Sequence, residues 1–517
     1  MRIGIDVGGT NTDAVLMDGS DLLGSTKTPT TRDVTSGIVT AIERLLDRPD
    51  ARALTAVMIG TTHFTNAIIE RRRLAHTAVV RLGLPATQSV EPFEDWPDDL
   101  RDAIGADAYL LHGGNEFDGR EISPLDEDQL VATVQELVRA GVEAVAVAAV
   151  FSPIAPQMEQ RAAEIITREA PELALTLSHE IGRLGLLERE NAAAINAALR
   201  GLAAATVESF RRSLAELAIG APLYLTQNDG TLMSSEAAER YPVLTFASGP
   251  TNSMRGAAFL SGLDHALVLD VGGTSSDIGA LVNGFPRESA LSATFADVRT
   301  NFRMPDLLSF GLGGGSIVHA DTIGPESVGY EITQRGLIFG GDVLTATDIA
   351  VAAEMADIGD ASRVASLDRE LVGVYVALMQ RRIEDSLDRM KLGKRPEPVI
   401  VVGGGSILVG ESFAGISDVV RPRNFAVANA VGAAIAQISG DADHIFALAQ
   451  FTRAEALDHA RRLATERARE AGAEPETIRI VEIEDLPVAY MESSMLRVRA
   501  KAVGELMTAA PHARTEG

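Results

Sequence analysis

A glycine-rich segment occurs twice in this chain, about half its length apart. Residues 2–19 read RIGIDVGGTNTDAVLMDG, and residues 266–284 read ALVLDVGGTSSDIGALVNG. When Asp6 is aligned with Asp270, Asp13 falls on Asp277 and the two Gly-Gly-Thr turns coincide. Each copy is an apolar run, a tight turn and a second apolar run, which predicts two strands joined by a hairpin turn. We therefore expect two copies of one ancestral domain, with the chemistry between them.

Helical and strand patterns alternate around both copies, which predicts an α/β fold. Helices are expected at 34–48, 61–74, 126–140, 153–170, 186–218, 344–356, 366–391 and 424–438, and strands at 55–60, 77–82, 142–150 and 398–402. From residue 445 the pattern changes to a charged helix at 452–471 and two strand-like segments, a small C-terminal α+β appendage. A chain of 517 residues exceeds one core. We predict domains at 1–185, 186–444 and 445–517.

The charge of the chain limits its partners. The formal net charge is −26 and the isoelectric point is about 4.8, so nucleic acid is not an expected partner. An acidic chain still binds nucleotide phosphates through backbone amides and a divalent cation. The absence of cysteine excludes disulfides and thiolate chemistry. No secretion signal or membrane-length apolar run is evident, so we expect a cytoplasmic protein without a membrane partner.

The repeated turns are suited to holding the phosphates of ATP. Paired glycines allow close backbone approach, and the residues after them offer N–H and hydroxyl donors. Ordinary glycine-rich hairpins are the structural alternative. The predicted phosphate-binding residues are Gly8, Gly9, Thr10, Asn11, Thr12 and Asp13 in the first turn, and Gly272, Gly273, Thr274, Ser275, Ser276 and Asp277 in the second.

Asp6 and Asp270 end the first strand of each hairpin, where a carboxylate can hold Mg²⁺ through its waters. One of the two is also a candidate to orient the attacking nucleophile. The alternative for each is an Asx turn that caps its own hairpin. For Asp13 and Asp277, a structural role with hydroxyl and amide partners in the same turn is as good an explanation as phosphate binding.

Two further glycine runs lie in the second half. Gly403, Gly404, Gly405 and Ser406 follow a predicted buried strand and precede a helix expected to begin near Glu411, which suits contact with a purine or ribose. The run 311–316, GLGGGS, either lines the same cleft or forms a tight turn.

Three further places in the first half are weaker candidates. His63 stands at a strand-to-helix junction beside threonines and is a candidate catalytic residue, although a lone histidine is more often structural. The segment 227–230, QNDG, and the segment 248–250, SGP, combine turn residues with short polar groups, and turn chemistry alone explains them equally well.

Through DVGGTNTD, GTTHFTNAIIERR, SGP, RGAAFLSGLDHALVLDVGGTSSDIG and GLGGGSI, the chain resembles the hydantoinase A / 5-oxoprolinase family over roughly residues 1–440. The resemblance implies duplicated actin-like (ribonuclease H-like) ATPase domains. By matching positions it implies phosphate loops at 8–12 and 272–276, carboxylates for metal or water at Asp6 and Asp270, and a nucleoside contact at 403–406. Asn11, His63 with Phe64, and the stretch 329–336 depart from the family pattern.

The resemblance also implies an activity. Family members use ATP and Mg²⁺ to phosphorylate the carbonyl oxygen of a stable cyclic amide, such as a hydantoin or 5-oxoproline, so that water can open the ring. A hydantoinase B-like or other hydrolase subunit is then an expected partner, and the oligomeric state stays open. The alternatives are a small-molecule kinase, an ATP-driven activator or switch, and a ketone-activating carboxylase subunit of the same fold.

Overall fold

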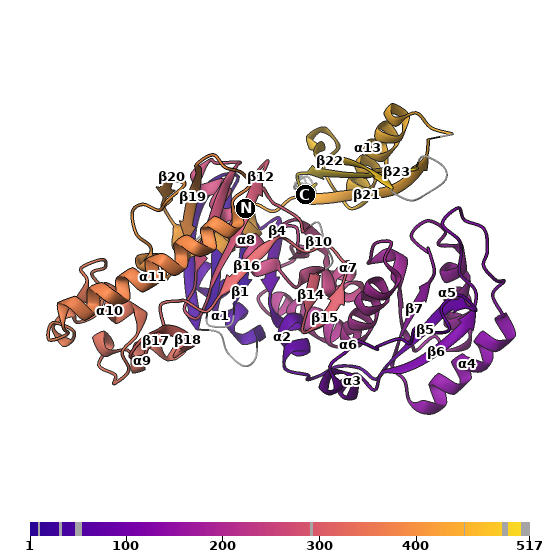
Figure 1. Cartoon of the computed structure of the whole chain (residues 1–517), viewed down its shortest axis with the longest axis horizontal. Coiled ribbons are helices and arrows are strands. Elements are labelled where there is room, and N and C mark those ends of the chain that lie inside the picture. Colours follow the sequence, from indigo (N-terminus) through magenta and orange to yellow (C-terminus); the bar gives the residue numbers. More distant parts are fainter. Residues whose placement is uncertain are drawn as a thin grey trace, which may run out of the picture.

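The computed structural model describes residues 1–8, 11–29, 34–46, 54–289, 293–448, 450–488 and 495–507. Three larger sheets organise these residues, and helices cover their faces (Figure 1). Two of the sheets carry the repeated hairpins, and the third belongs to a separate module. Two small two-stranded ribbons, β14–β15 and β17–β18, complete the strands.

The first sheet has nine strands in the order β22-β23-β21-β10-β9-β4-β1-β2-β3. Its core strands carry alternating apolar side chains such as Ile3 and Ile5, which pack against α1, α2 and the long helix α6. The bounds are β1 Arg2–Val7, β2 Asn11–Asp18, β3 Asp21–Pro29, β4 Ala56–Thr61, β9 Leu223–Thr226, β10 Leu232–Ser234, α1 Val34–Leu46, α2 His63–Ile69, α6 Leu186–Glu216 and α7 Ser235–Arg240.

The second sheet repeats the same core. Its order is β13-β12-β11-β19-β20, with β16 also paired to β12, and α10 and α11 pack against it. The bounds are β11 Ala266–Val271, β12 Ser276–Val282, β13 Phe285–Pro286, β14 Ala293–Phe295, β15 Val298–Thr300, β16 Leu307–Phe310, β17 Ser316–Val318, β18 Ile323–Ser327, β19 Glu397–Val402, β20 Ile416–Val420, α9 Ile332–Arg335, α10 Ala346–Ala352 and α11 Arg369–Met390.

The two halves are joined by a close crossing of two helices, α8 (Ser248–Ser261) and α12 (Ala428–Ala434). A methyl group on Gly256 would lie 1.8 Å from the carbonyl oxygen of Ala428, and one on Gly432 would lie 1.8 Å from that of Asn252. A methyl on Gly4 of β1 would likewise meet the backbone of α12 at 2.3 Å. Glycine is therefore required at these three places because backbone packs directly on backbone.

A four-stranded parallel sheet, β6-β5-β7-β8, forms a module of its own, seen at the right of Figure 1. Strand β7, read from the sequence at 142–150 as buried, is fully buried, and side chains of α4 and α5 pack in the same core. The bounds are β5 Thr77–Leu84, β6 Asp107–His112, β7 Ala144–Ala149, β8 Ala174–Leu177, α3 Asp98–Ile104, α4 Glu127–Ala140 and α5 Gln157–Glu169.

The C-terminal strands β21 (Ile438–Ala447), β23 (Met495–Gly504) and β22 (Arg479–Val488), covered by α13 (Arg453–Glu470), extend the first sheet. The appendage is thus α+β as predicted but shares a sheet with β1. The segment containing β9 and β10, assigned from sequence to the second domain, also pairs in the first sheet. The boundaries at 185 and 444 remain predictions.

The helix predicted near Glu411 is wrong. Residues after the GGGS run form a short 3₁₀ turn at Ser406–Leu408 and then strand β20. Side chains of α11 hold this segment in a non-helical path: the amide of Gly410 donates to Gln380 Oε1 (2.7 Å) and that of Ala414 to Glu384 Oε1 (3.0 Å). These bonds satisfy backbone groups that a helix would otherwise pair.

Candidate active site

The two repeated segments fold into hairpins whose strands pair in the same register. In the first, Asp6 pairs with Asp13 across the strands, and in the second Asp270 pairs with Asp277 in the same register. The amide of the first glycine closes each turn, to Asn11 O at 3.0 Å and to Ser275 O at 2.9 Å. Each first strand also pairs in parallel with a neighbour, β4 or β19, so both aspartates lie at the carboxyl ends of parallel strands.

Asp6 is held by amide side chains from the two crossing helices. Asn252 Nδ2 donates to its Oδ1 at 3.0 Å, and Asn429 Nδ2 donates to its Oδ2 at 3.0 Å. The carboxyl group is 5% exposed. Burial raises the pKa of Asp6 from 3.8 to about 6, and the Asp13 carboxylate adds to this rise while the two amides oppose it. The site thus keeps a carboxylate in a place that disfavours its charge.

Asp270 occupies the matching position in the second hairpin and is partly exposed. Burial raises its pKa to about 6, a hydrogen bond from Ser253 opposes the rise, and the charges of Asp277, Asp6 and Asp13 increase it. The carboxylates of the two hairpins are therefore close enough to repel one another. A divalent cation or a set of phosphate-bound ligands placed between them would relieve this repulsion.

The second aspartate of each hairpin has a different partner. Lys27 Nζ lies 3.0 Å from Asp13 Oδ1, and Asn429 Nδ2 donates to Asp13 Oδ2 at 2.9 Å. Asp277 instead accepts from Ser309 Oγ, and burial raises its pKa. These contacts support the structural alternative for Asp13, because its oxygens are engaged within the protein.

Both glycine runs of the second half lie against the second hairpin. Gly314 N donates to Gly272 O at 3.0 Å and Gly315 N to Gly273 O at 2.7 Å. The run at 311–316 therefore packs against the turn through two backbone hydrogen bonds. Gly405 N donates to Val271 O at 2.7 Å. These bonds use carbonyl groups of the turn and leave the amides of Thr274 and Ser275 for other acceptors.

The exposed tip of the second hairpin is free to bind an anion. Among the described residues, the backbone amides of Thr274 and Ser275 have no acceptor, and both residues are exposed. Consecutive unpaired amides in a tight turn are a typical phosphate-binding arrangement. Gly403 has φ +86°, and a methyl group there would lie 2.3 Å from Asp270 Oδ1, so only glycine brings this backbone beside the carboxylate.

Several predicted site residues take other places. Gly9 and Thr10 lie outside the described residues. Thr12 and Ser276 are fully buried, and the Ser276 hydroxyl donates to Leu312 O at 2.6 Å, so it is committed to the core. Ser406 is also buried. Roles for these residues in binding remain predictions.

His63 begins α2, next to the first hairpin. Its amide donates to Thr61 Oγ1 at 3.2 Å, and Thr62 Oγ1 donates to Val7 O at 3.4 Å. Burial, followed by the charge of Arg73, lowers the pKa of His63, which favours a neutral imidazole. Within the described part of the chain, no hydrogen bond joins this imidazole to a hairpin aspartate, so its catalytic role stays a prediction.

Sequence reasoning missed the side chains that position the aspartates: Asn252, Ser253 and Asn429. The SGP segment proved to be the first turn of helix α8 rather than a free turn, and Asn252 and Ser253 follow it on that helix. The signal available was a run of small polar residues directly after SGP, TNS, in a stretch otherwise apolar.

The donor set is compatible with Mg²⁺. Within the described residues, no three carboxylate or histidine side chains gather closely enough to ligate one ion. Mg²⁺ keeps several waters and is commonly held by one or two carboxylates together with nucleotide phosphates. Asp6 and Asp270 are the carboxylates that fit this pattern, because both are hydrogen-bonded at the hairpins and both have pKa values raised by burial.

No helix among the described residues has the length and apolarity to cross a membrane.

Two sequence models of one family match the chain: the hydantoinase/oxoprolinase N-terminal region over residues 2–170, and hydantoinase/oxoprolinase over residues 189–357. The caprolactamase subunit alpha of Pseudomonas jessenii is 28% identical over 469 residues, 84% of this chain and 65% of that protein. The acetophenone carboxylase gamma subunit of Aromatoleum aromaticum is 27% identical over 398 residues, 68% of this chain and 52% of that protein. The chain thus spans about half to two thirds of the length of these relatives.

Solved structures agree on the fold. The ATP-dependent caprolactamase from Pseudomonas jessenii superposes with a TM-score of 0.75 at 20% identity, covering 100% of this chain and 89% of that one. Nucleotide-free acetone carboxylase superposes with a TM-score of 0.69 at 16% identity, with coverage of 100% and 89%. The predicted fold class, α/β with duplicated actin-like domains, is confirmed. Because the two family models together match well over half of the sequence, the chain belongs to the hydantoinase/oxoprolinase family.

Proposed function

We propose that this chain is the ATP-dependent subunit of a cyclic amide hydrolase, which activates the carbonyl oxygen of a lactam or imide ring for opening by water. The observation that carries the proposal is the matched pair of hairpin aspartates, Asp6 and Asp270: burial raises the pKa of both to about 6, and the charge of Asp6 adds to the rise at Asp270. Such a pair is costly to the empty protein. It becomes favourable when a metal-bound triphosphate lies between the hairpins.

When bound, Mg-ATP would supply the phosphoryl group that converts an unreactive amide oxygen into a leaving group. The chain's own contribution is positioning and charge neutralisation. The exposed amides of Thr274 and Ser275 would hold phosphate oxygens. Asn252 and Asn429 hold the Asp6 carboxylate in place, where it would help to bind the metal ion. Gly403 admits the backbone that would contact the nucleoside.

The proposal includes a partner subunit. Two of the relatives above are named as subunits, alpha of a caprolactamase and gamma of a carboxylase. Ring opening would then be completed on a hydrolase partner, while this chain performs the ATP-dependent step.

A second candidate is the activation of a ketone for carboxylation. The likeness to the acetophenone carboxylase gamma subunit and to acetone carboxylase supports it. Both candidates share the same step, attack of a carbonyl oxygen on the γ-phosphorus with ADP as the leaving group. They differ in the carbonyl compound, amide or ketone, and therefore in which compound accelerates ATP hydrolysis.

The test is ATP hydrolysis by the purified chain with Mg²⁺, alone and with any co-purifying partner, against hydantoins, 5-oxoproline, larger lactams and simple ketones. Stimulation by one ring class, lost in Asp270→Asn and kept in Asp418→Asn, supports the first candidate. Asp418 is an exposed aspartate of the same sheet and serves as the matched control. Stimulation by ketones alone supports the second. ATP binding without stimulation by any compound, partner present, contradicts both.

A further inference from the structure

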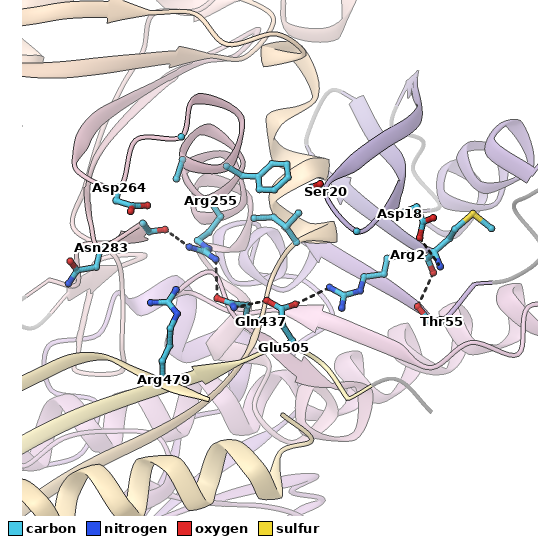
Figure 2. A pocket seen from close by; sticks show the side chains of 17 residues that line it. Arg2, Asp18, Ser20, Thr55, Arg255, Asp264, Asn283, Gln437, Arg479 and Glu505 are labelled. Carbon is cyan, nitrogen blue, oxygen red and sulfur yellow. Dashed lines mark hydrogen bonds and ion pairs between the residues drawn. The ribbon is translucent and has the colours of Figure 1, made fainter. Parts of the chain in front are cut away.

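A cavity of about 690 Å³ lies at the ends of the hairpins opposite their glycine turns. It is lined by the far turns Asp18–Gly19 and Asn283–Gly284, by helix α8, and by Arg479 of strand β22 (Figure 2). The two hairpins and the C-terminal appendage therefore meet at this cavity. Neither the proposed nucleotide site nor any predicted residue uses it. Its lining includes three arginines, Arg2, Arg255 and Arg479, together with three carboxylates, Asp18, Asp264 and Glu505.

Arg255, on α8, is the central group of this cavity. Its side chain is buried, with the residue 8% exposed, yet none of the described carboxylates lies within 4.0 Å of it. Its Nη1 donates to Gly284 O and its Nη2 to Gln437 Oε1 at 3.4 Å, while Nε has no partner. Its guanidinium stacks on the Phe285 ring at 3.8 Å. Burial, and then the charge of Arg479, lowers its pKa to about 10.

No carboxylate among the described residues forms an ion pair with Arg255, although the more distant charges of Asp229, Glu505 and Asp264 favour its charged form. Among the described residues, Arg479 forms no ion pair, and in Figure 2 it extends toward Arg255 and Asn283. Glu505 accepts from Gln437 Nε2 at 2.8 Å and lies 3.5 Å from Arg2 Nη1. Asp18 lies 4.0 Å from the terminal amine, and Asp264 lies beside Gly284, where its charge partly offsets that of Arg255 without forming an ion pair.

We propose that this cavity binds a small organic anion, with its carboxylate or phosphate group held between Arg255 and Arg479. A buried guanidinium that forms no ion pair and leaves Nε without a partner is costly, and an arginine fork matches the two oxygens of a carboxylate or phosphate. Ala258, Phe259 and Ile435 supply an apolar wall for a short hydrocarbon body. The volume exceeds what a bare inorganic anion needs.

The cavity is physically connected to the hairpin aspartates. Arg255 follows Asn252 by three residues on α8, so the two side chains lie one helical turn apart, and Asn252 holds Asp6. An anion that binds Arg255 therefore contacts the same helix whose Asn252 side chain orients Asp6. If the proposed function holds, the ring-opened product carries a new carboxylate and belongs to the ligand class. An effect of the bound anion on ATP turnover, through α8 and Asp6, rests on the proposed function, whereas binding of the anion does not.

Calorimetric titration of the full chain tests binding, with Mg-ADP present to occupy the hairpins. The probes are glutarate, a short dicarboxylate, and inorganic phosphate. We expect saturable binding that weakens by about tenfold or more in Arg479→Ala, as expected for a lost charge-assisted contact. Arg462→Ala, which removes an exposed arginine of α13 outside the cavity, should bind as the wild type does.

Arg255→Lys is a second variant, which retains the charge and removes the fork. Reduced affinity in this variant, with unchanged unfolding temperature, supports the assignment. Tighter binding of glutarate than phosphate identifies a carboxylate ligand, and the reverse identifies a phosphate. Equal affinity in wild type and Arg479→Ala, or no binding of either probe below about 10 mM, overturns the proposal. Because the readout is binding, its failure is distinct from a failure of ATP turnover.

Discussion

Replacement of Asp270 by asparagine should stabilise the nucleotide-free chain while abolishing ATP turnover. The carboxylate is enclosed by the second hairpin, the GGGS run and Ser253, and its pKa is raised to about 6 by burial and by the neighbouring Asp277 and Asp6 charges. Asparagine has nearly the same shape but carries no charge. The variant therefore removes the free-energy cost of holding a charged carboxylate at this site in the folded protein.

The magnitude follows from the pKa. A rise from 3.8 to about 6 corresponds to at most about 3 kcal/mol at neutral pH, and since Asp270 retains some solvent exposure we expect about 1–3 kcal/mol. At pH values between these two pKa values, the Asp270 carboxyl is protonated in a larger fraction of folded chains than of unfolded chains. Stability due to Asp270 therefore decreases as pH rises from about 4 to above 6, and the full cost is present at pH 7.5.

The assay is thermal unfolding of wild type and Asp270→Asn without nucleotide at pH 7.5 and pH 5. We expect the variant to melt a few degrees higher at pH 7.5, with roughly half of that advantage lost at pH 5, where the wild-type carboxyl is largely protonated. Asp418→Asn, at an exposed site, should show neither effect. A variant less stable than wild type at pH 7.5, with a difference that does not vary with pH, would refute the reasoning.

Three further substitutions test the geometry. Gly403→Ala should lower ATP turnover more than tenfold, because its methyl would displace the second-hairpin carboxylate, whereas Gly404→Ala, with open space around it, should retain turnover. Asn429→Ala, which removes the amide shared by both first-hairpin carboxylates, should reduce turnover about tenfold to a hundredfold and raise the lower pH limit of activity. Gly432→Ala should lower the unfolding temperature by several degrees through the helix crossing, while Gly201→Ala, in an uncrowded helical position, should not.

The hairpins were predictable because their signal is local. Asp6 and Asp270 stand at the ends of apolar runs beside glycine pairs, and the structure gives both the same register. The GGGS run was correctly placed after a buried strand. Such features depend on residues within about ten positions, where periodicity and turn chemistry decide the outcome.

The rest depended on contacts between distant residues. Asn429 and Asp6 are 423 positions apart, and nothing in the local pattern of an alanine-rich helix marks its asparagine as a partner of the hairpin. The helix predicted near Glu411 failed because Gln380 and Glu384, on another helix, bind the backbone there. A single sequence shows neither kind of contact, because tertiary hydrogen bonds override local propensity.

The sharing of one sheet by β1–β4, β9–β10 and β21–β23 bears on the order in which the chain folds during synthesis. Strand β10 and the apolar side chains Ala56, Met58 and Leu232 pack with residues beyond Ile438, which leave the ribosome long after them. Until then one edge of the first sheet has neither its neighbour nor its covering helix, and such edges invite pairing with other chains. The first half should therefore rely on chaperone protection, or on its own delay in forming that edge, until the last strands are made.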